Sequence, residues 1–380
     1  MTEKKLHILF LNSWYPSLVL ANNGDFIQRH AEAVASKHQV TALHVISNES
    51  IKNETITDRE IHGVRTLITY LKPEKSVLKK QILFFKSYKK LISMCGDFDL
   101  VHVNRLFPAG LMAIWLKLFH RKPYIISEHF TGYLAPFSSK LSKAETTASK
   151  LISQQAHYVC PVSQNLAENM QNLGLQGNYY PVPNVVDTEI FTSKASHNER
   201  FTLIHVSSLV NDHKNVTGIL QVIARLQEHI PDFLFYLIGN NPFQYQDLIE
   251  SLKINTRHIE LIDQLPHHEV ASYLQNSDVL ILFSNYENLP CVILEAFACG
   301  TKVIATDVGG INEFFPKNFG RLIRPKDEDQ LLESILEIYK SLAVTEKSDM
   351  HQYAESHFGV EKICNEFSNL YYKSLPKNQA

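Results

Sequence analysis

The sequence has few cysteines, and nothing in their spacing pairs them. Its 380 residues include five, an odd number, and no C-x-x-C motif occurs. They stand at positions 95, 160, 291, 299 and 364. A disulfide framework would need an even, clustered set. We therefore expect reduced, structural cysteines and a cytoplasmic protein.

Long hydrophobic runs are also absent. No stretch reaches the ~18 apolar residues of a membrane span, and residues 1–10 lack the apolar segment of a signal peptide. The G-x-G-x-x-G fingerprint of dinucleotide-binding folds is missing. A net charge of −2 lacks the basic excess of a nucleic-acid binder, so nucleic acid is not an expected partner.

The charge is unevenly distributed along the chain. Residues 1–190 carry 21 Lys and Arg against 15 Asp and Glu, whereas residues 191–380 carry 16 against 24. The segment Ser76–Ser93 holds five lysines, no acid and several apolar residues at helical spacing. It is either a surface helix with extended lysines or a helix attracted to an anionic membrane face.

Short apolar runs alternate with helical patterns through most of the chain. Such alternation predicts βαβ units and parallel sheets covered on both faces. In the first half we expect strands at 6–11, 40–46, 64–71, 100–104, 124–127 and 158–162. In the second half we expect them at 201–206, 234–238, 259–262, 279–283 and 303–306.

The chain length and a Pro-containing linker indicate two domains. A chain of 380 residues exceeds one typical core, and residues 179–191 read Y-Y-P-V-P-N-V-V-D-T-E-I-F. We therefore predict an α/β protein with Rossmann-like domains at 1–185 and 195–355. Residues 351–375 form a helical, aromatic end, of which 358–380 is expected to return to the first domain.

One stretch, residues 284–313, concentrates the candidate chemistry. A buried strand precedes it, and the helix that follows is expected to begin at Pro290, which suits a first helical turn, and to end before Gly300. Glu287 lies at the mouth of that helix and Glu295 eight positions further on. A helix N-terminus suits phosphate, while the carboxylates suit the hydroxyls of a sugar and a ribose. Alternatively, Glu287 neighbours a cap and Glu295 is a solvated helix residue.

The combination of N-L-P, E-x7-E, A-x-A-x-G and D-x-G-G resembles the donor site of the retaining glycosyltransferases of family 4. The linker is similar to that family's P-N-G-V-D…F pattern, with Val185 in place of the glycine. The resemblance implies a GT-B fold, with a donor/acceptor cleft between the two domains. It also implies a nucleotide-sugar donor bound by the second domain and no metal or other cofactor.

The resemblance assigns roles to residues of this stretch. Glu295 would hold the ribose and Glu287 the sugar hydroxyls. The diphosphate would bind Lys214 and the segment Asn288, Leu289, Pro290, Cys291 and Val292. A cation in the loop before a helix can neutralise a diphosphate without a metal. The family has an arginine six residues before this lysine, where the present sequence has Ser208.

Two candidates lie in the first half of the chain. His129 follows a strand in I-I-S-E-H-F-T-G-Y, where ligands of open α/β sheets collect. The resemblance places it near the transferred sugar, with Glu128 as a weaker neighbour. Gly24, after the first strand, would let the backbone approach donor phosphate or acceptor. Simple turn geometry and a backbone-bonded histidine are the alternatives.

Three further patterns are interpreted as structural. Asp97 and Asp99 form a D-x-D motif, but they lead directly into a strand. His267, His268 and Glu269 follow a proline at a helix start. Cys291 and Cys299 bracket the donor helix without a positioned base. None is therefore expected to bind metal or act as a nucleophile.

The resulting hypothesis is a retaining glycosyltransferase that moves a sugar from a nucleotide-sugar to a saccharide or lipid-linked acceptor. By resemblance it would build a surface polysaccharide or glycolipid, in the cytoplasm or on the inner face of the cytoplasmic membrane. Two alternatives remain: a GT-B nucleotide-sugar epimerase, and a catalytically silent sugar-nucleotide-binding protein.

Overall fold

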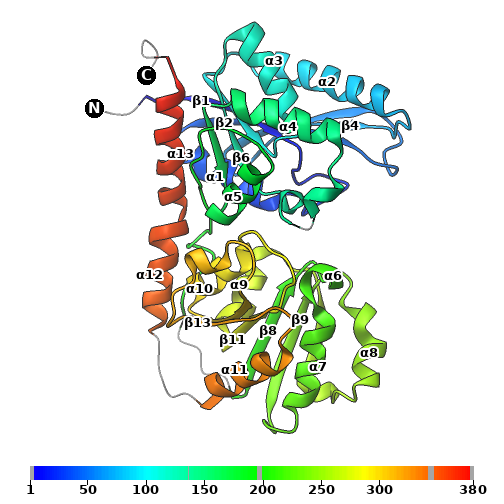
Figure 1. The fold of residues 1–380 in the computed structure, drawn as a ribbon, viewed down its shortest axis with the longest axis vertical. Helices are drawn as coiled ribbons and strands as arrows, with labels where there is room; N and C mark the ends of the chain where they lie inside the picture. The colour runs from blue at the N-terminus through cyan, green and yellow to red at the C-terminus, as the bar shows by residue number, and fades with distance from the viewer. Residues whose placement is uncertain (1–3, 136, 195–198, 341–345, 377–380) are drawn as a thin grey trace. The chain divides into compact units, whose positions relative to one another are not determined.

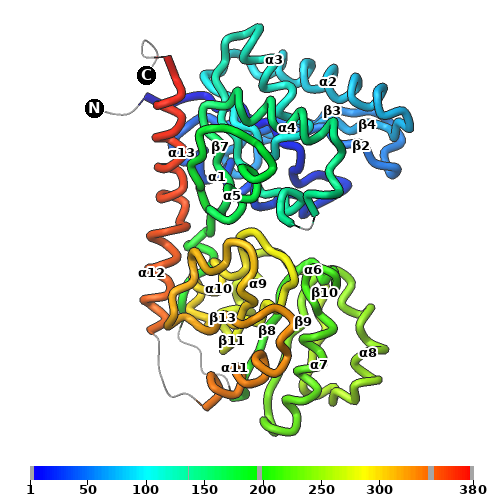
Figure 2. The backbone as a smooth tube through the Cα atoms, viewed as in Figure 1, coloured from blue at the N-terminus to red at the C-terminus, as the bar shows by residue number. Residues whose placement is uncertain are grey.

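A computed structural model describes residues 4–135, 137–194, 199–340 and 346–376. The chain divides into two compact units. Unit 1 comprises Met1–Val185 and Val360–Ala380, and unit 2 comprises Val186–Gly359. Figure 2 follows the backbone from the green helix α5 into unit 2 and then into the red helix α13.

Unit 1 is built on a seven-stranded sheet with the order β3-β4-β2-β1-β5-β6-β7. Its strands are β1 (His7–Asn12), β2 (Gln39–Ser47), β3 (Thr55–Ile61), β4 (Val64–Leu71), β5 (Leu100–Asn104), β6 (Tyr124–Glu128) and β7 (Tyr158–Pro161). Its helices are α1 (Asp25–Ala35), α2 (Val77–Ser93), α3 (Gly110–His120), α4 (Lys143–Gln155), α5 (Gln164–Asn172) and α13 (Val360–Ser374). The central strands β1, β2, β5 and β6 are buried along almost their whole length, as both-face coverage requires.

The strand β3 departs from the predicted parallel sheet. It pairs antiparallel with β4 at the edge of the sheet. Five of the seven residues in its sequence, T-I-T-D-R-E-I, are polar, and none is fully buried. A solvated edge strand carries little of the apolar signal that reveals a central strand, so the sequence analysis missed it.

Unit 2 holds a six-stranded parallel sheet with the order β10-β9-β8-β11-β12-β13. Its strands are β8 (Phe201–Ser207), β9 (Phe233–Gly239), β10 (Ile259–Asp263), β11 (Val279–Leu282), β12 (Lys302–Thr306) and β13 (Gly320–Ile323). Its helices are α6 (Asn211–Lys214), α7 (Val216–Leu226), α8 (Gln246–Ser251), α9 (His267–Gln275), α10 (Cys291–Cys299), α11 (Glu328–Lys340) and α12 (Lys347–Phe358). The strand β13 was not predicted, because its sequence, G-R-L-I, holds only two apolar residues.

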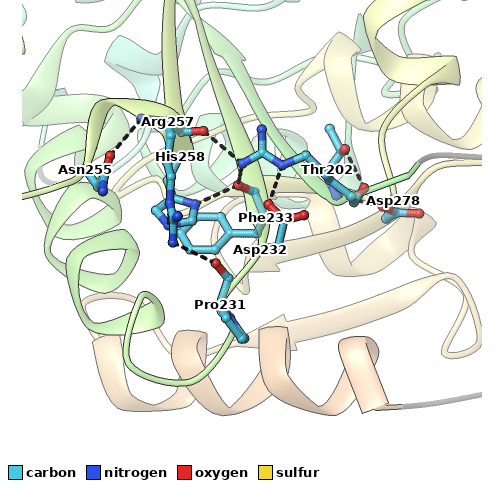
Figure 3. A network of polar contacts seen from close by, with 9 residues as sticks. Thr202, Pro231, Asp232, Phe233, Asn255, Arg257, His258 and Asp278 are labelled. Carbon is cyan, nitrogen blue, oxygen red and sulfur yellow. Dashed lines mark hydrogen bonds and ion pairs between the residues drawn. The ribbon is translucent and has the colours of Figure 1, made fainter.

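A polar network fastens the amino ends of the strands in unit 2 (Figure 3). Arg200 donates to the Asp232 carboxylate at 2.7 Å and to the carbonyl oxygens of Phe233 and Arg257. Thr202 and Asp278 bond to each other at 2.8 Å through two hydrogen bonds, and these tie β8 to the start of β11. Side chains of unit 2 therefore already occupy the amino ends of these strands.

The two last helices belong to different units. α12 packs on α10 in unit 2, where His351 Nδ1 lies 2.7 Å from the carbonyl oxygen of Ala298. α13 lies beside α1 and inserts Phe367 and Tyr371 into the core of unit 1 (Figure 1). The chain thus crosses between units at Gly359, and α13 lies in unit 1, the domain to which residues 358–380 were expected to return. No helix in the described ranges combines the length and apolarity needed to cross a bilayer.

Several histidines are buried without charge in the two cores. Burial lowers the pKa of His30, His44 and His205 to about 4. It also lowers the pKa of His102 and His129 well below the usual 6.5. Four of these five histidines lie in unit 1. Protonation of such a ring favours the unfolded chain, which solvates the imidazolium.

We predict that stability falls as the pH drops from 7 towards 5. The unfolded chain binds protons below pH 6.5, whereas these folded imidazoles stay neutral down to about 4. Each histidine therefore costs about 1.4 kcal/mol of unfolding free energy per pH unit in that window. Urea unfolding at several pH values measures the slope. His44→Gln should flatten it, and replacement of the exposed His120 should not. Equal slopes for all three proteins would contradict the prediction.

Candidate functional site

The loop between β11 and α10 places the first candidate glutamate. β11 ends at Leu282, and Pro290 is the N-cap of α10, so the helix begins one residue later than expected, at Cys291. The helix ends at Gly300, which adopts the left-handed conformation predicted for its C-cap. Glu287 is buried in this loop, and its Oε1 accepts a hydrogen bond from Ser284 Oγ at 2.7 Å.

Lys214 contacts this glutamate from the segment that follows the neighbouring strand, β8. It is the last residue of α6, and Asn215, with φ 48°, turns the chain into α7. Lys214 Nζ lies 2.5 Å from Glu287 Oε1, and the side chains are 18% and 9% exposed. β8 and β11, which lead into these loops, are adjacent where the strand order reverses. Ligands of open α/β sheets bind outside the carboxyl ends of the strands at such a point.

The second glutamate is buried, which contradicts the alternative of a solvated helix residue. Glu295 is 4% exposed within α10. Asn288 and Leu289 are also buried, whereas Pro290, Cys291 and Val292 at the helix start are partly exposed. Ser208, in the place of the family's arginine, is exposed in the loop after β8. Unit 2 thus contains two buried carboxylates, a lysine and a partly exposed helix start.

The loop after β12 closes against the loop that carries Glu287. Gly310 N donates to the carbonyl oxygen of Asn288 at 2.9 Å. Gly309 has φ 61°, and a Cβ added there would lie 1.9 Å from the carbonyl oxygen of Glu287. The D-x-G-G segment therefore needs glycine for a close backbone approach.

In unit 1, His129 and Glu128 stand at the carboxyl end of β6. The His129 ring packs 4.6 Å from Phe26 and 5.4 Å from His30, measured between centroids. Burial first, and then the neighbouring histidines, hold its pKa well below the usual value. Glu128 is fully buried and accepts hydrogen bonds from the backbone N–H groups of Leu106, His129 and Phe130. Glu128 therefore anchors three loop residues around the strand end.

Gly24 has a packing reason to be glycine. It is the N-cap of α1 with φ 77°, and an added Cβ would lie 2.9 Å from the backbone carbon of Trp14. This contact joins α1 to the loop after β1. The expected role of Gly24 towards donor or acceptor is a separate matter and stays a prediction.

The sequence analysis missed one residue of this strand edge, Arg105. It follows β5 directly, and its guanidinium contacts the rings of both Trp14 and Phe130. A cation immediately after a buried strand, at the carboxyl edge, was the signal available in the sequence.

The patterns interpreted as structural have local contacts in the structure. The carboxylate of Asp97 lies 2.7 Å from Lys122 Nζ, and that of Asp99 accepts from the backbone of His7. α9 begins at His267 as expected for a helix start. All five cysteines are described, and none of them forms a disulfide. Burial raises the pKa of the Cys299 thiol, which disfavours a nucleophilic thiolate.

Models of known families match most of the chain. Residues 26–190 match "Glycosyltransferase Family 4", and residues 186–357 match "Glycosyl transferases group 1". The two matches meet near the boundary between the units.

Individual relatives agree with these matches. An uncharacterized glycosyltransferase of Methanocaldococcus jannaschii is 27% identical over 90% of this chain and 95% of its own. A putative teichuronic acid biosynthesis glycosyltransferase of Bacillus subtilis is 28% identical over 62% of this chain and 60% of its own. The structure of Anabaena HepE in complex with UDP and glucose superposes with a TM-score of 0.73 at 17% identity, over 97% of this chain and all of that one. This likeness establishes the GT-B fold.

We predict that Gly309→Ala destabilises the protein by about 1–3 kcal/mol more than Gly63→Ala. Both glycines have positive φ, 61° and 77°, so both variants carry the same left-handed penalty. Gly63 has open space around it, whereas the new methyl at 309 meets the Glu287 carbonyl. Urea unfolding compares the two variants. Equal losses would show that the approach to Glu287 is not tight.

Proposed function

Because the chain belongs to glycosyltransferase family 4, we propose that it transfers a sugar from a nucleotide-activated donor to a saccharide or lipid-linked saccharide, with retention of anomeric configuration. The observation that carries this proposal is the pairing of Lys214 with Glu287 at 2.5 Å beside the start of α10. A cation, a carboxylate and a helix N-terminus together suit a phosphorylated sugar.

The donor site divides the nucleotide-sugar among its residues. Glu295 binds the ribose hydroxyls and Glu287 the hydroxyls of the transferred sugar. Lys214 and the backbone N–H groups of residues 289–292 bind the diphosphate. When the donor enters, its phosphates compete with Glu287 for the ammonium group of Lys214. Ser208 cannot supply the positive charge that the family has there, so Lys214 and the helix dipole carry more of the diphosphate charge.

The chemistry that we propose needs no metal and no separate base. Lys214 and the helix start stabilise the charge of the leaving diphosphate. The departing phosphate accepts the proton of the acceptor hydroxyl on the face from which it leaves, which accounts for retention. His129 takes part on the acceptor side as a neutral imidazole, since its lowered pKa keeps it uncharged near pH 7.

The titles of related structures suggest the first donors to try. HepE has been crystallised with UDP and with UDP-glucose. We propose a uridine diphosphate sugar as donor, with transfer of a hexose. The name of the Bacillus relative, which concerns teichuronic acid, supports an anionic surface polysaccharide as the product class. Such assembly would take place in the cytoplasm.

We predict opposite effects for the two glutamates. Glu295→Gln should weaken UDP binding by about tenfold, because one charge-assisted hydrogen bond to the ribose is lost. Glu287→Gln should spare UDP binding and lower kcat by about 100-fold. Calorimetry with UDP and a UDP-sugar turnover assay measure the two effects. The assay contains EDTA, because the mechanism uses no metal.

The same assay separates the alternatives. Turnover that requires an acceptor supports transfer, and change of the sugar without an acceptor would indicate an epimerase. UDP binding without any turnover would indicate a silent binding protein. Rescue of EDTA-inhibited turnover by Mg²⁺ or Mn²⁺ would refute the metal-free mechanism, and an equal loss of UDP affinity in both variants would refute the division of roles.

We further propose that α2 places the enzyme on an anionic membrane surface. Tyr88 and Leu91 are its buried residues and anchor it to unit 1. Val77, Leu78 and Ile82 are exposed, Leu78 by 72%, so this part of the apolar stripe is not packed on the sheet. The five lysines of the helix are also exposed. Exposed apolar residues beside lysines suit the boundary between acidic headgroups and acyl chains.

We predict that the protein sediments with anionic vesicles and not with neutral ones. Each lysine near the surface contributes about 1 kcal/mol of attraction, which salt screens. Lys79→Gln/Lys80→Gln should reduce the bound fraction. The matched pair Lys4→Gln/Lys5→Gln, also exposed and in unit 1, should not. Leu78→Ser tests the apolar contribution separately. Equal sedimentation with both vesicle types at low salt would refute the proposal.

A further inference from the structure

Arg105 lies at the carboxyl ends of the strands in unit 1, where two aromatic rings hold its guanidinium. Its guanidinium carbon lies 4.3 Å from the ring centre of Trp14 and 4.1 Å from that of Phe130. The three residues follow the neighbouring strands β1, β5 and β6. The strand order of this sheet reverses between β1 and β5, so Trp14 and Arg105 flank its topological switch point, where ligands of such sheets bind.

The Arg105 side chain is about four-fifths buried, yet its Nε lacks an acceptor among the described residues. Its side chain is 19% exposed. Nε is buried with no hydrogen-bond partner among the residues that the structure describes. The Glu145 carboxylate is 3.8 Å from Nη2, beyond hydrogen-bonding distance. The two rings contact the guanidinium from adjacent directions and not from opposite faces, because their centres are 5.7 Å apart and their planes meet at 73°. Burial of unsatisfied donors is costly unless a ligand supplies acceptors.

The backbone holds this arrangement in place. Arg105 has φ 69°, a left-handed conformation that a residue with a long side chain rarely adopts. Its N–H donates to the carbonyl oxygen of Ser127 at 2.9 Å, and its own carbonyl accepts from Ser13 Oγ. The buried Glu128 carboxylate fixes the next residue, Leu106, and also Phe130. A strained residue that its surroundings determine so fully is typical of a binding site.

We propose that Arg105 binds an oxyanion of the acceptor, a carboxylate or a phosphate, through two parallel hydrogen bonds from its edge. Both groups match the planar fork of a guanidinium. This inference rests on the proposed function, in which unit 2 carries the donor and unit 1 the acceptor. An anionic acceptor also suits the basic first half of the chain. The enzyme would therefore extend an acidic or phosphate-linked saccharide and discriminate against a neutral one.

Trp14 makes the site observable. The chain has two tryptophans, Trp14 and Trp115, so Trp115→Phe leaves the ring that stacks on Arg105 as the only indole. UDP is added first, to saturate the donor site, and glucuronate or glycerol phosphate is then titrated. Glucose and glycerol are the neutral controls. We expect a saturable change in fluorescence with at least one anion and none with the neutral compounds.

Variants in the Trp115→Phe background assign the response. Arg105→Gln should weaken anion binding by about tenfold or more, and Arg105→Lys should weaken it less, because lysine keeps the charge but loses the fork. Arg121→Gln is the matched control, since Arg121 is an exposed arginine of unit 1 that also has positive φ, 56°. It should bind as the parent does. If Arg105→Gln fails to fold, Arg105→Lys carries the comparison.

Each outcome has one meaning. A response to glucuronate alone identifies a carboxylate acceptor, and a response to glycerol phosphate alone identifies a phosphate. No saturable response to either anion, or equal affinities in Arg105→Gln and Arg121→Gln, would overturn the assignment of Arg105 while UDP binding remains intact. Loss of UDP binding in Arg105→Gln would overturn it too. Failure of the parent to bind UDP or any UDP-sugar would instead count against the proposed function.

Discussion

The ion pair between Lys214 and Glu287 is the interaction on which the candidate donor site depends. It joins the loops after β8 and β11 across the switch point of the sheet in unit 2. Both side chains are largely removed from water, so each charge needs the other, and loss of one partner leaves an uncompensated charge at a cost of about 3–5 kcal/mol. A ligand that separates them must itself satisfy both. A phosphate for the lysine and hydroxyls for the carboxylate meet that requirement together.

In each sheet the candidate site residues lie at the carboxyl ends of the strands. In unit 2, the amino ends of the strands are closed by Arg200, which donates to the Asp232 carboxylate and to two backbone carbonyl oxygens. The carboxyl edge instead carries the lysine, the glutamates and a helix start. In unit 1, the same edge carries His129 and Arg105. Parallel strands end together, so residues distant in sequence are brought together there without long loops.

The sequence was sufficient where one physical signal dominated. Buried central strands appear in the sequence as apolar runs, and the predicted bounds of β4 and β5 match the structure at both ends. The strand β3, most of whose residues are polar, gives no such signal. The candidate donor segment could be singled out because its residues are contiguous. A local sequence pattern does not contain contacts between residues far apart in the chain. Two such contacts are the pairing of Lys214 with Glu287 and the stacking of Arg105 on Trp14. The burial of Glu295 likewise depends on the surrounding fold.

The return of α13 to unit 1 has a consequence for biosynthesis. Residues of α13, among them Phe367 and Tyr371, fill the core of unit 1 beside β1, whereas unit 2 is complete at Gly359. On the ribosome, synthesis of unit 1 therefore starts before that of unit 2 and ends after it. The core of unit 1 lacks the apolar side chains of α13 until the whole of unit 2 has been translated. The exposed apolar surface in that interval is the kind that chaperones bind.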